Sequence, residues 1–168
     1  MDQLLIALRI VHQVFGVFWV GTAFFVTLFL EPRLRGLGPA IQGAVMRALM
    51  PVLSPAMLIA AMLTIGAGTA MAILLRRFML SAFFSSGWGW AMLIGFVTAM
   101  CAFTIGLALI TPTGLRMDKL GRGMAGRAPK PEELREMEGL SRKLSTLSRA
   151  DMVLVLVAVG AMAVSRYV

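Results

Sequence analysis

The side chains best suited to chemistry lie near the start of the chain. Arg9, His12, Gly16 and Trp19 follow one another at three- and four-residue spacing, so a helix places them along one stripe. His12 is the only histidine of the chain. Because imidazole and guanidinium groups are costly in an apolar segment, they tend to face a protein interior or a ligand. The stripe therefore indicates either a cofactor site or a polar contact between helices.

Two interpretations of His12 follow from its residue type. In the first, the imidazole hydrogen-bonds a neighbouring helix while Trp19 packs in the interior. In the second, the imidazole ligates the iron of a haem held between helices. Arg9, Arg76 and Arg77 would then lie on the side of the propionates, although a basic membrane border explains Arg76 and Arg77 equally well. The sequence does not assign a second axial ligand for the haem. A methionine could serve, but methionines in apolar stretches usually pack in the core; those near or within such stretches are Met57, Met62, Met92, Met100, Met152 and Met162.

The composition defines the elements that must carry this stripe. Of 168 residues, 59% are hydrophobic and only 14% are charged, which is typical of a membrane protein. A span needs about 20 apolar residues, and four stretches qualify, at about residues 4–30, 52–75, 88–111 and 150–167. The sequence therefore predicts an all-α fold, an integral membrane four-helix bundle that forms a single domain over residues 1–168.

The charges predict how this bundle is oriented. Lys and Arg number 16 against 8 Asp and Glu, and most of the basic residues fall in the loops at residues 31–51 and 112–149. Positive residues favour the cytoplasm, so these loops are expected inside and both termini outside a multi-pass protein of the cell inner (plasma) membrane. The lipid bilayer is then the partner that explains the basic balance, and nucleic acid is not needed. A homo-oligomer and a larger membrane complex both stay open.

The third loop, residues 112–149, divides into two parts. Residues 121–130 combine glycine with basic side chains, which is typical of a flexible linker. Pro131, Glu132 and Glu133 suit the start of a helix. Apolar residues then recur at helical spacing, at Leu134, Met137, Leu140, Leu144 and Leu147. The pattern predicts an amphipathic cytoplasmic helix that runs directly into the last span and lies against the anionic inner leaflet, with a partner-docking surface as the alternative.

Asp151 stands at the predicted cytoplasmic entry to the last span. Arg149 lies only two residues away on the same helix and so cannot face it. We therefore expect Asp151 to pair with Arg33 or Arg35, at the end of the first helix.

Three segments of the first helix carry a family resemblance, namely Leu8-Arg9-Ile10-Val11-His12, Trp19-Val20-Gly21 and Pro32-Arg33-Leu34. Their order and spacing resemble those of small four-helix integral membrane proteins of the wider copper-resistance-D and HemJ-like group. The resemblance implies that His12 is a ligand of haem b. The helix stripe and the predicted topology then make Arg9, Gly16, Trp19, Arg76 and Arg77 the candidate cofactor-binding residues around it.

The leading hypothesis is thus a cytochrome b-like membrane protein that binds haem b and acts in electron transfer or porphyrin redox chemistry. The alternatives are a cofactor-free structural or accessory subunit that docks a partner through its cytoplasmic helix, and a small transporter. A transporter is disfavoured because polar residues are scarce in the middle spans, where threonine hydroxyls can bond their own helix backbone, at Thr64, Thr69, Thr98 and Thr104. No nucleotide-binding loop or nucleophile constellation is visible, so enzymatic activity stays open.

Overall fold

The computed structural model describes residues 2–76 and 84–168, and within these residues all regular structure is helical. The first helix, α1 (Asp2–Phe25), continues through the π-helical turn η1 (Val26–Leu30) into α2 (Glu31–Gly36). After Leu37 and Gly38 the chain enters α3 (Pro39–Arg76). The next long stretch is α5 (Gly87–Ile105), η2 (Gly106–Ile110) and α6 (Thr111–Gly123), and α7 (Pro131–Val164) closes the chain.

Four of these helical stretches are long enough and apolar enough to cross a membrane, counting only the residues that the structure describes. They are Asp2–Gly36, Ile41–Leu75, Gly87–Gly123 and Pro131–Val164. The prediction of an all-helical chain with four long apolar helices is confirmed. At 1.5 Å per residue, the 38 residues of α3 extend about 57 Å, whereas a hydrocarbon core is about 30 Å thick. Each helix is therefore longer than one crossing requires.

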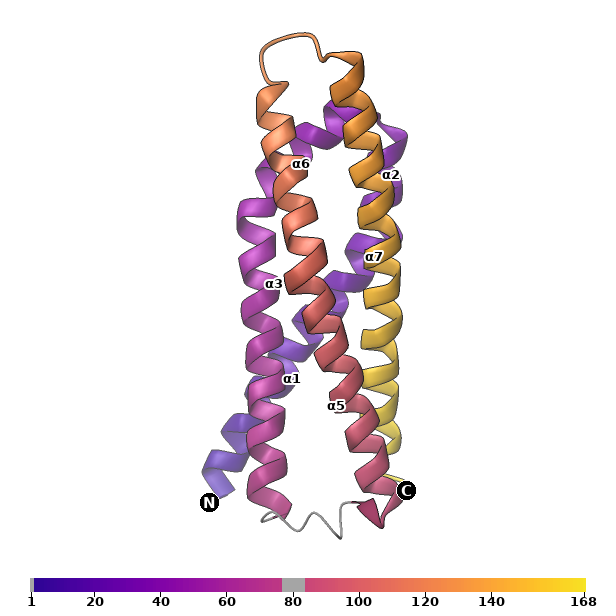
Figure 1. Ribbon diagram of the computed structural model, residues 1–168. Helices are drawn as coiled ribbons and strands as arrows, with labels where there is room; N and C mark the ends of the chain where they lie inside the picture. The colour runs from indigo at the N-terminus through magenta and orange to yellow at the C-terminus, as the bar shows by residue number, and fades with distance from the viewer. Residues whose placement is uncertain (1, 77–83) are drawn as a thin grey trace.

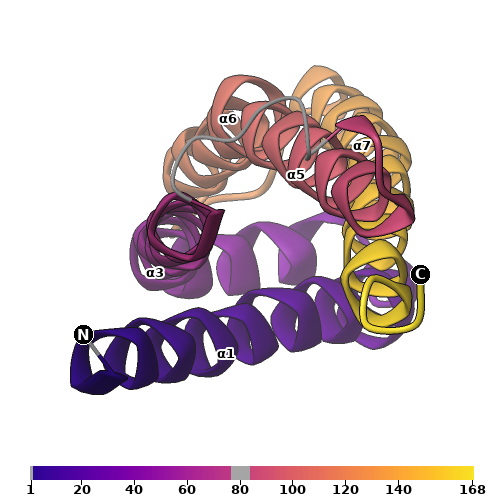
Figure 2. The ribbon, with the colours of Figure 1, turned by 90° about the horizontal axis from the view of Figure 1, so that it is seen from below.

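The long helices lie side by side, and both termini lie at the same end of the molecule (Figure 1). In the view from that end, α1 runs obliquely along one side of the molecule, at the lower edge of the picture (Figure 2). It packs mainly on α3, while α5 packs mainly on α7, and α6 joins the two pairs through its contacts with α3. Consecutive long helices thus pair along two seams, and α6 connects the two pairs.

Two groups of buried apolar side chains lie between the helices. One contains Trp19, Ala60, Ala61, Ala99, Ala102, Val155 and Ala158. The other lies toward the α6 end and contains Leu34, Met46, Met117, Met124, Met137 and Leu144. Met137 and Leu144 belong to the predicted amphipathic helix, whose continuity with the last span is confirmed by α7. The apolar side chains of that helix are therefore covered within this chain.

The predicted linker at residues 121–130 is shorter than expected, because α6 continues to Gly123. Gly121 belongs to the helix rather than to a flexible segment. A Cβ built on Gly121 would lie only 2.7 Å from the backbone oxygen of Gly43 in α3, so the absence of a side chain lets the two helices touch through their backbones. The connection at residues 31–51 is mostly helical, in α2 and the first turns of α3, and the start of α3 at Pro39 agrees with the helical stretch that the sequence predicts before the second span.

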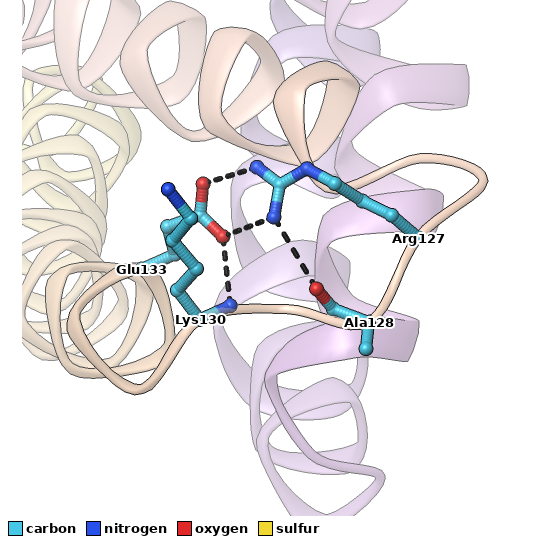
Figure 3. A network of polar contacts seen from close by, with 4 residues as sticks. All are labelled: Arg127, Ala128, Lys130 and Glu133. Carbon is cyan, nitrogen blue, oxygen red and sulfur yellow. Dashed lines mark hydrogen bonds and ion pairs between the residues drawn. The ribbon is translucent and has the colours of Figure 1, made fainter.

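The turn between α6 and α7 is held by a small polar network (Figure 3). The guanidinium of Arg127 donates two hydrogen bonds to the carboxylate of Glu133, at 2.5 and 2.9 Å, and the backbone N–H of Lys130 donates a third at 2.9 Å. The hydrogen bond from Arg127 is the main cause that lowers the pKa of Glu133 to about 2, with the Lys130 N–H adding to it. These hydrogen bonds connect Arg127 and Lys130, in the turn before α7, to Glu133 in its first turn.

Candidate functional site

His12 contacts the backbone of α3 directly. Its Nδ1 lies 2.7 Å from the carbonyl oxygen of Thr64. A carbonyl oxygen only accepts hydrogen bonds, so Nδ1 must carry the proton and donate. In the neutral imidazole the lone pair then resides on Nε2. The expected polar contact between helices therefore exists, and it occupies only one of the two ring nitrogens.

Gly68 makes room for this ring. It follows Thr64 by one helical turn, so the two residues share a face of α3. A Cβ built on Gly68 would lie 2.9 Å from both Cε1 and Nδ1 of His12, which is closer than side-chain carbons approach such atoms. The imidazole therefore packs directly against the backbone of Gly68, in the space that a side chain at this position would fill. A backbone carbonyl that fixes the tautomer of a histidine is the arrangement commonly found behind histidines that bind metals.

His12 lines a cavity of about 670 Å³ between α1, α3, α5 and α7, at the end of the molecule that holds the termini. This volume falls within the range of about 300–1,000 Å³ typical of small-molecule and cofactor sites. Most of the lining is apolar, including Ile65, Leu93 and Phe96, and Met71, Met92 and Met162 also reach it. The cavity thus combines an imidazole with a wide apolar wall.

Two arginines line the same cavity. Arg9 was expected there, and Arg166, near the end of α7, joins it from the opposite end of the sequence. Both residues are exposed. Arg76 ends α3, with only its backbone described, and Arg77 lies outside the described residues. Of the arginines that the sequence suggests as partners of haem propionates, Arg9 lines the cavity. Arg166, which the sequence did not suggest for this role, lines it as well.

Gly16 and Trp19 continue the stripe of α1 but do not line this cavity. A Cβ on Gly16 would meet the Thr64 side chain at 3.4 Å, so Gly16 belongs to the seam between α1 and α3. Trp19 is 6% exposed and packs in the first apolar group. The structure thus brings Arg9 and His12 together with the cavity and leaves Gly16 and Trp19 in packing positions.

Some of the methionines that the sequence suggests as axial ligands line the cavity, and others do not. Met92 and Met162 line the His12 cavity, whereas Met62 and Met100 are exposed on the outer surface. Met162 packs closely on Gly95, where a built Cβ would lie 3.2 Å from its Cγ. Met71, which sequence reasoning did not name, also lines the cavity. Thioethers from α3, α5 and α7 are therefore present on the cavity that His12 lines.

Within residues 2–76 and 84–168, no group of three or more His, Cys, Asp or Glu side chains is placed to hold a metal ion. A bare ion on His12 would thus find few protein ligands. A haem suits this donor set better, since its porphyrin supplies the equatorial nitrogens and needs only axial ligands from the protein.

The expectation for Asp151 is wrong. Its carboxylate makes no ion pair with Arg33 or Arg35 within 4 Å, and the ion pairs in the described part of the chain are Arg116–Glu136, Arg122–Asp118 and Arg127–Glu133. Arg35 instead donates a hydrogen bond to Ser145 at 2.9 Å. The acid nearest the end of the first helix is Glu31, which accepts a hydrogen bond from Ser148 of α7. The first helical stretch thus contacts α7 through both Arg35 and Glu31, and no cation among the described residues pairs with Asp151.

Comparison with known proteins adds no assignment, since no family model, no curated protein and no solved structure matches the chain.

Proposed function

We propose that this chain is an integral membrane four-helix bundle that holds haem b on His12. The four long apolar helices, with both termini at one end, support four crossings of a bilayer. Because the helices exceed the thickness of the hydrocarbon, their α6 ends project beyond it. These ends carry most of the Lys and Arg residues, so the positive-inside rule favours a cytoplasmic location for them and an outward location for the His12 cavity.

One observation carries the haem proposal. The hydrogen bond of 2.7 Å from Nδ1 of His12 to the Thr64 carbonyl fixes the tautomer that leaves Nε2 unprotonated, on a residue that lines a cavity of about 670 Å³. Nε2 has no hydrogen-bond partner within the described residues. A fixed imidazole with an available Nε2 beside a cofactor-sized apolar space is the donor arrangement that a haem requires.

The surrounding residues suit the other parts of a haem. Apolar side chains such as Phe96 and Leu93 would cover the porphyrin and exclude water from it. Arg9 and Arg166 would pair with the propionates, since guanidinium groups bind carboxylates through paired hydrogen bonds. When bound, the haem supplies one-electron redox chemistry, which fits membrane electron transfer or a porphyrin redox reaction. The residues of this chain bind and orient the group.

The two alternatives have less support from the geometry. An accessory subunit was expected to dock its partner through residues 131–149, but in that segment Met137 and Leu144 are buried against the chain itself, and Leu134 and Leu140 are partly buried beside them. A transporter needs polar groups along its path. The hydroxyls of Thr64, Thr69, Thr98 and Thr104 donate instead to carbonyls one turn earlier on their own helices, as the sequence predicts.

The experiment that tests the proposal is a titration of the purified full chain with haemin in mild detergent, followed by absorbance in the Soret region. We expect the parent to bind haem with a shifted Soret band that survives gel filtration. His12→Ala removes the imidazole and should abolish this band, while the helix content measured by circular dichroism stays the same.

Gln13→Ala is the matched control. Gln13 lies next to His12 and lines the same cavity, but it makes no hydrogen bond in the described part of the chain. The Gln13 variant should bind haem like the parent. A parent that stays colourless after the titration, or a His12→Ala variant with the parental spectrum, would contradict the proposal.

A further inference from the structure

A second cavity lies between the first helical stretch (α1, η1 and α2), α3, the stretch formed by α5, η2 and α6, and α7, and it shares no lining residue with the His12 cavity. Its volume is about 110 Å³. Its walls are mostly carbon, with Trp19, Met57 and Phe103 among them, but Glu31 and Asp151 also line it. The other polar residues of the lining carry only hydroxyls, at Thr22, Thr27, Ser54, Thr111 and Ser148. Two acids on such a mostly apolar cavity are unusual because a buried carboxylate normally has a partner of opposite charge.

Glu31 is only partly satisfied. It is 4% exposed, and its Oε1 accepts a hydrogen bond of 2.5 Å from the Ser148 hydroxyl. Its Oε2 is buried without a hydrogen-bond partner in the part of the chain that the structure describes. The positive charges of Arg35 and Arg149 act on Glu31, although neither lies within ion-pair distance. The two arginines thus offset only part of the cost of burying a charged Glu31, and one of its oxygens is left without a donor.

Asp151 has no such compensation. It is 6% exposed and follows Ser148 by three residues, about 4.5 Å along the axis of α7 and on the same face. Its carboxylate makes no hydrogen bond or ion pair with the described residues, and no charged group acts on it. An uncompensated carboxylate in an apolar cavity is strongly unfavourable. One positive charge placed beside Asp151 would remove this cost.

We propose that this cavity binds a small organic ammonium ion, with the charged nitrogen between Asp151 and Glu31 and the apolar body against Trp19, Met57 and Phe103. The carboxylate of Asp151, on which no charged group acts, calls for one positive charge.

A bare metal cation suits the cavity less well, because most of the lining is apolar and no group of three or more His, Cys, Asp or Glu side chains among the described residues is placed to hold a metal ion. The size of the ligand is limited as well. An apolar cavity of about 150 Å³ holds a benzene molecule, so this one accommodates a short alkylammonium.

The test is equilibrium dialysis of radiolabelled n-butylammonium against the purified full chain in detergent. We expect saturable binding to the parent that unlabelled butylammonium competes away. Butan-1-ol has nearly the same shape without the charge, and Na⁺ has the charge without the apolar body. Neither should compete at equal concentration.

Asp151→Asn and Glu31→Gln keep the size of each side chain and remove its charge, and each should weaken binding by about tenfold or more, as expected for loss of a charge-assisted hydrogen bond. Asp118→Asn is the matched control, since Asp118 is also buried (4% exposed) but lies outside the cavity and pairs with Arg122. This variant should bind like the parent.

The proposal is overturned if the parent shows no saturable binding, if butan-1-ol or Na⁺ competes as well as butylammonium, or if Asp151→Asn binds like the parent. If Asp151→Asn does not fold, the competition experiments on the parent still decide. The outcome does not depend on haem binding, because the two cavities share no residue.

Discussion

Replacing Gly68 with alanine tests how His12 is seated. The added Cβ would lie 2.9 Å from Cε1 and Nδ1 of the imidazole, whereas favourable contacts begin at about 3.5 Å. The ring must therefore withdraw by about 0.6 Å. The hydrogen bond to Thr64, now 2.7 Å, would stretch to about 3.3 Å, past the usual limit for N–H···O geometry.

The expected effects on stability and on haem binding differ in size. Losing a hydrogen bond between membrane helices costs about 0.6 to 2 kcal/mol, while Gly→Ala inside a helix contributes about 0.5 to 1 kcal/mol in the other direction. The thermal stability of Gly68→Ala should thus stay close to that of the parent. Haem affinity should fall by about 10- to 100-fold, as is usual when the group that orients a metal ligand is lost.

Thermal unfolding followed by circular dichroism, together with haemin titration in the Soret region, measures both effects. Gly66→Ala is the control, because a Cβ on Gly66 meets nothing within 4 Å and adds only helix propensity. It should bind haem like the parent. If Gly68→Ala binds haem as tightly as Gly66→Ala, the seating of His12 on Gly68 has no role in haem binding.

Three further results are expected. A reporter fused to the C-terminus should lie outside the cytoplasm and one inserted in the turn between α6 and α7 should lie inside; the reverse pattern would overturn the orientation. Glu133→Gln should make that turn more sensitive to protease at neutral pH. In the parent, the contribution of Glu133 to stability is fully present above its ordinary pKa of 4.5 and should be lost as the pH falls through about 2; protection that is unchanged between pH 5 and pH 2 would refute this. Gly121→Val should force α6 away from the backbone of Gly43 and destabilise the protein by about 1–3 kcal/mol in chemical denaturation, whereas a variant as stable as the parent would show that the close approach is not needed.

The helices were largely predictable from the sequence, because each is encoded by a local pattern. The apolar stretches predict the long helices, and the leucine and methionine spacing after Pro131 predicts the first half of α7. The helix ends were less predictable. Gly121 and Gly123 indicate a linker by propensity, but packing of Gly121 on Gly43 keeps α6 helical to Gly123.

The candidate site was predictable only in part, since it depends on which helices meet. The stripe of α1 identifies His12 and Arg9, yet nothing in the local pattern pairs His12 with Thr64 or Gly68 of α3. Arg166 reaches the cavity from the end of α7, more than 150 residues later in the chain. The rotation of each helix and its neighbour decides these contacts.

The prediction for Asp151 failed for the same reason. Its position at the predicted start of the last span suggested a cation on the first helix. Asp151 and Ser148 share one face of α7 and both line the second cavity, but Ser148 is the residue that lies within hydrogen-bond distance of Glu31. Asp151 lies one turn further along α7, and the sequence pattern does not decide which of the two turns meets the first helix.

Pulsed electron paramagnetic resonance on haem-loaded protein, grown with ¹⁵N-labelled histidine, tests the central claim most directly. His12 is the only histidine of the chain, so the label marks one imidazole. If Nε2 ligates the ferric iron, the spectrum should contain a ¹⁵N hyperfine coupling that is distinct from the ¹⁴N couplings of the porphyrin and absent from unlabelled protein. A haem-loaded sample that shows only the porphyrin ¹⁴N couplings would contradict ligation by His12.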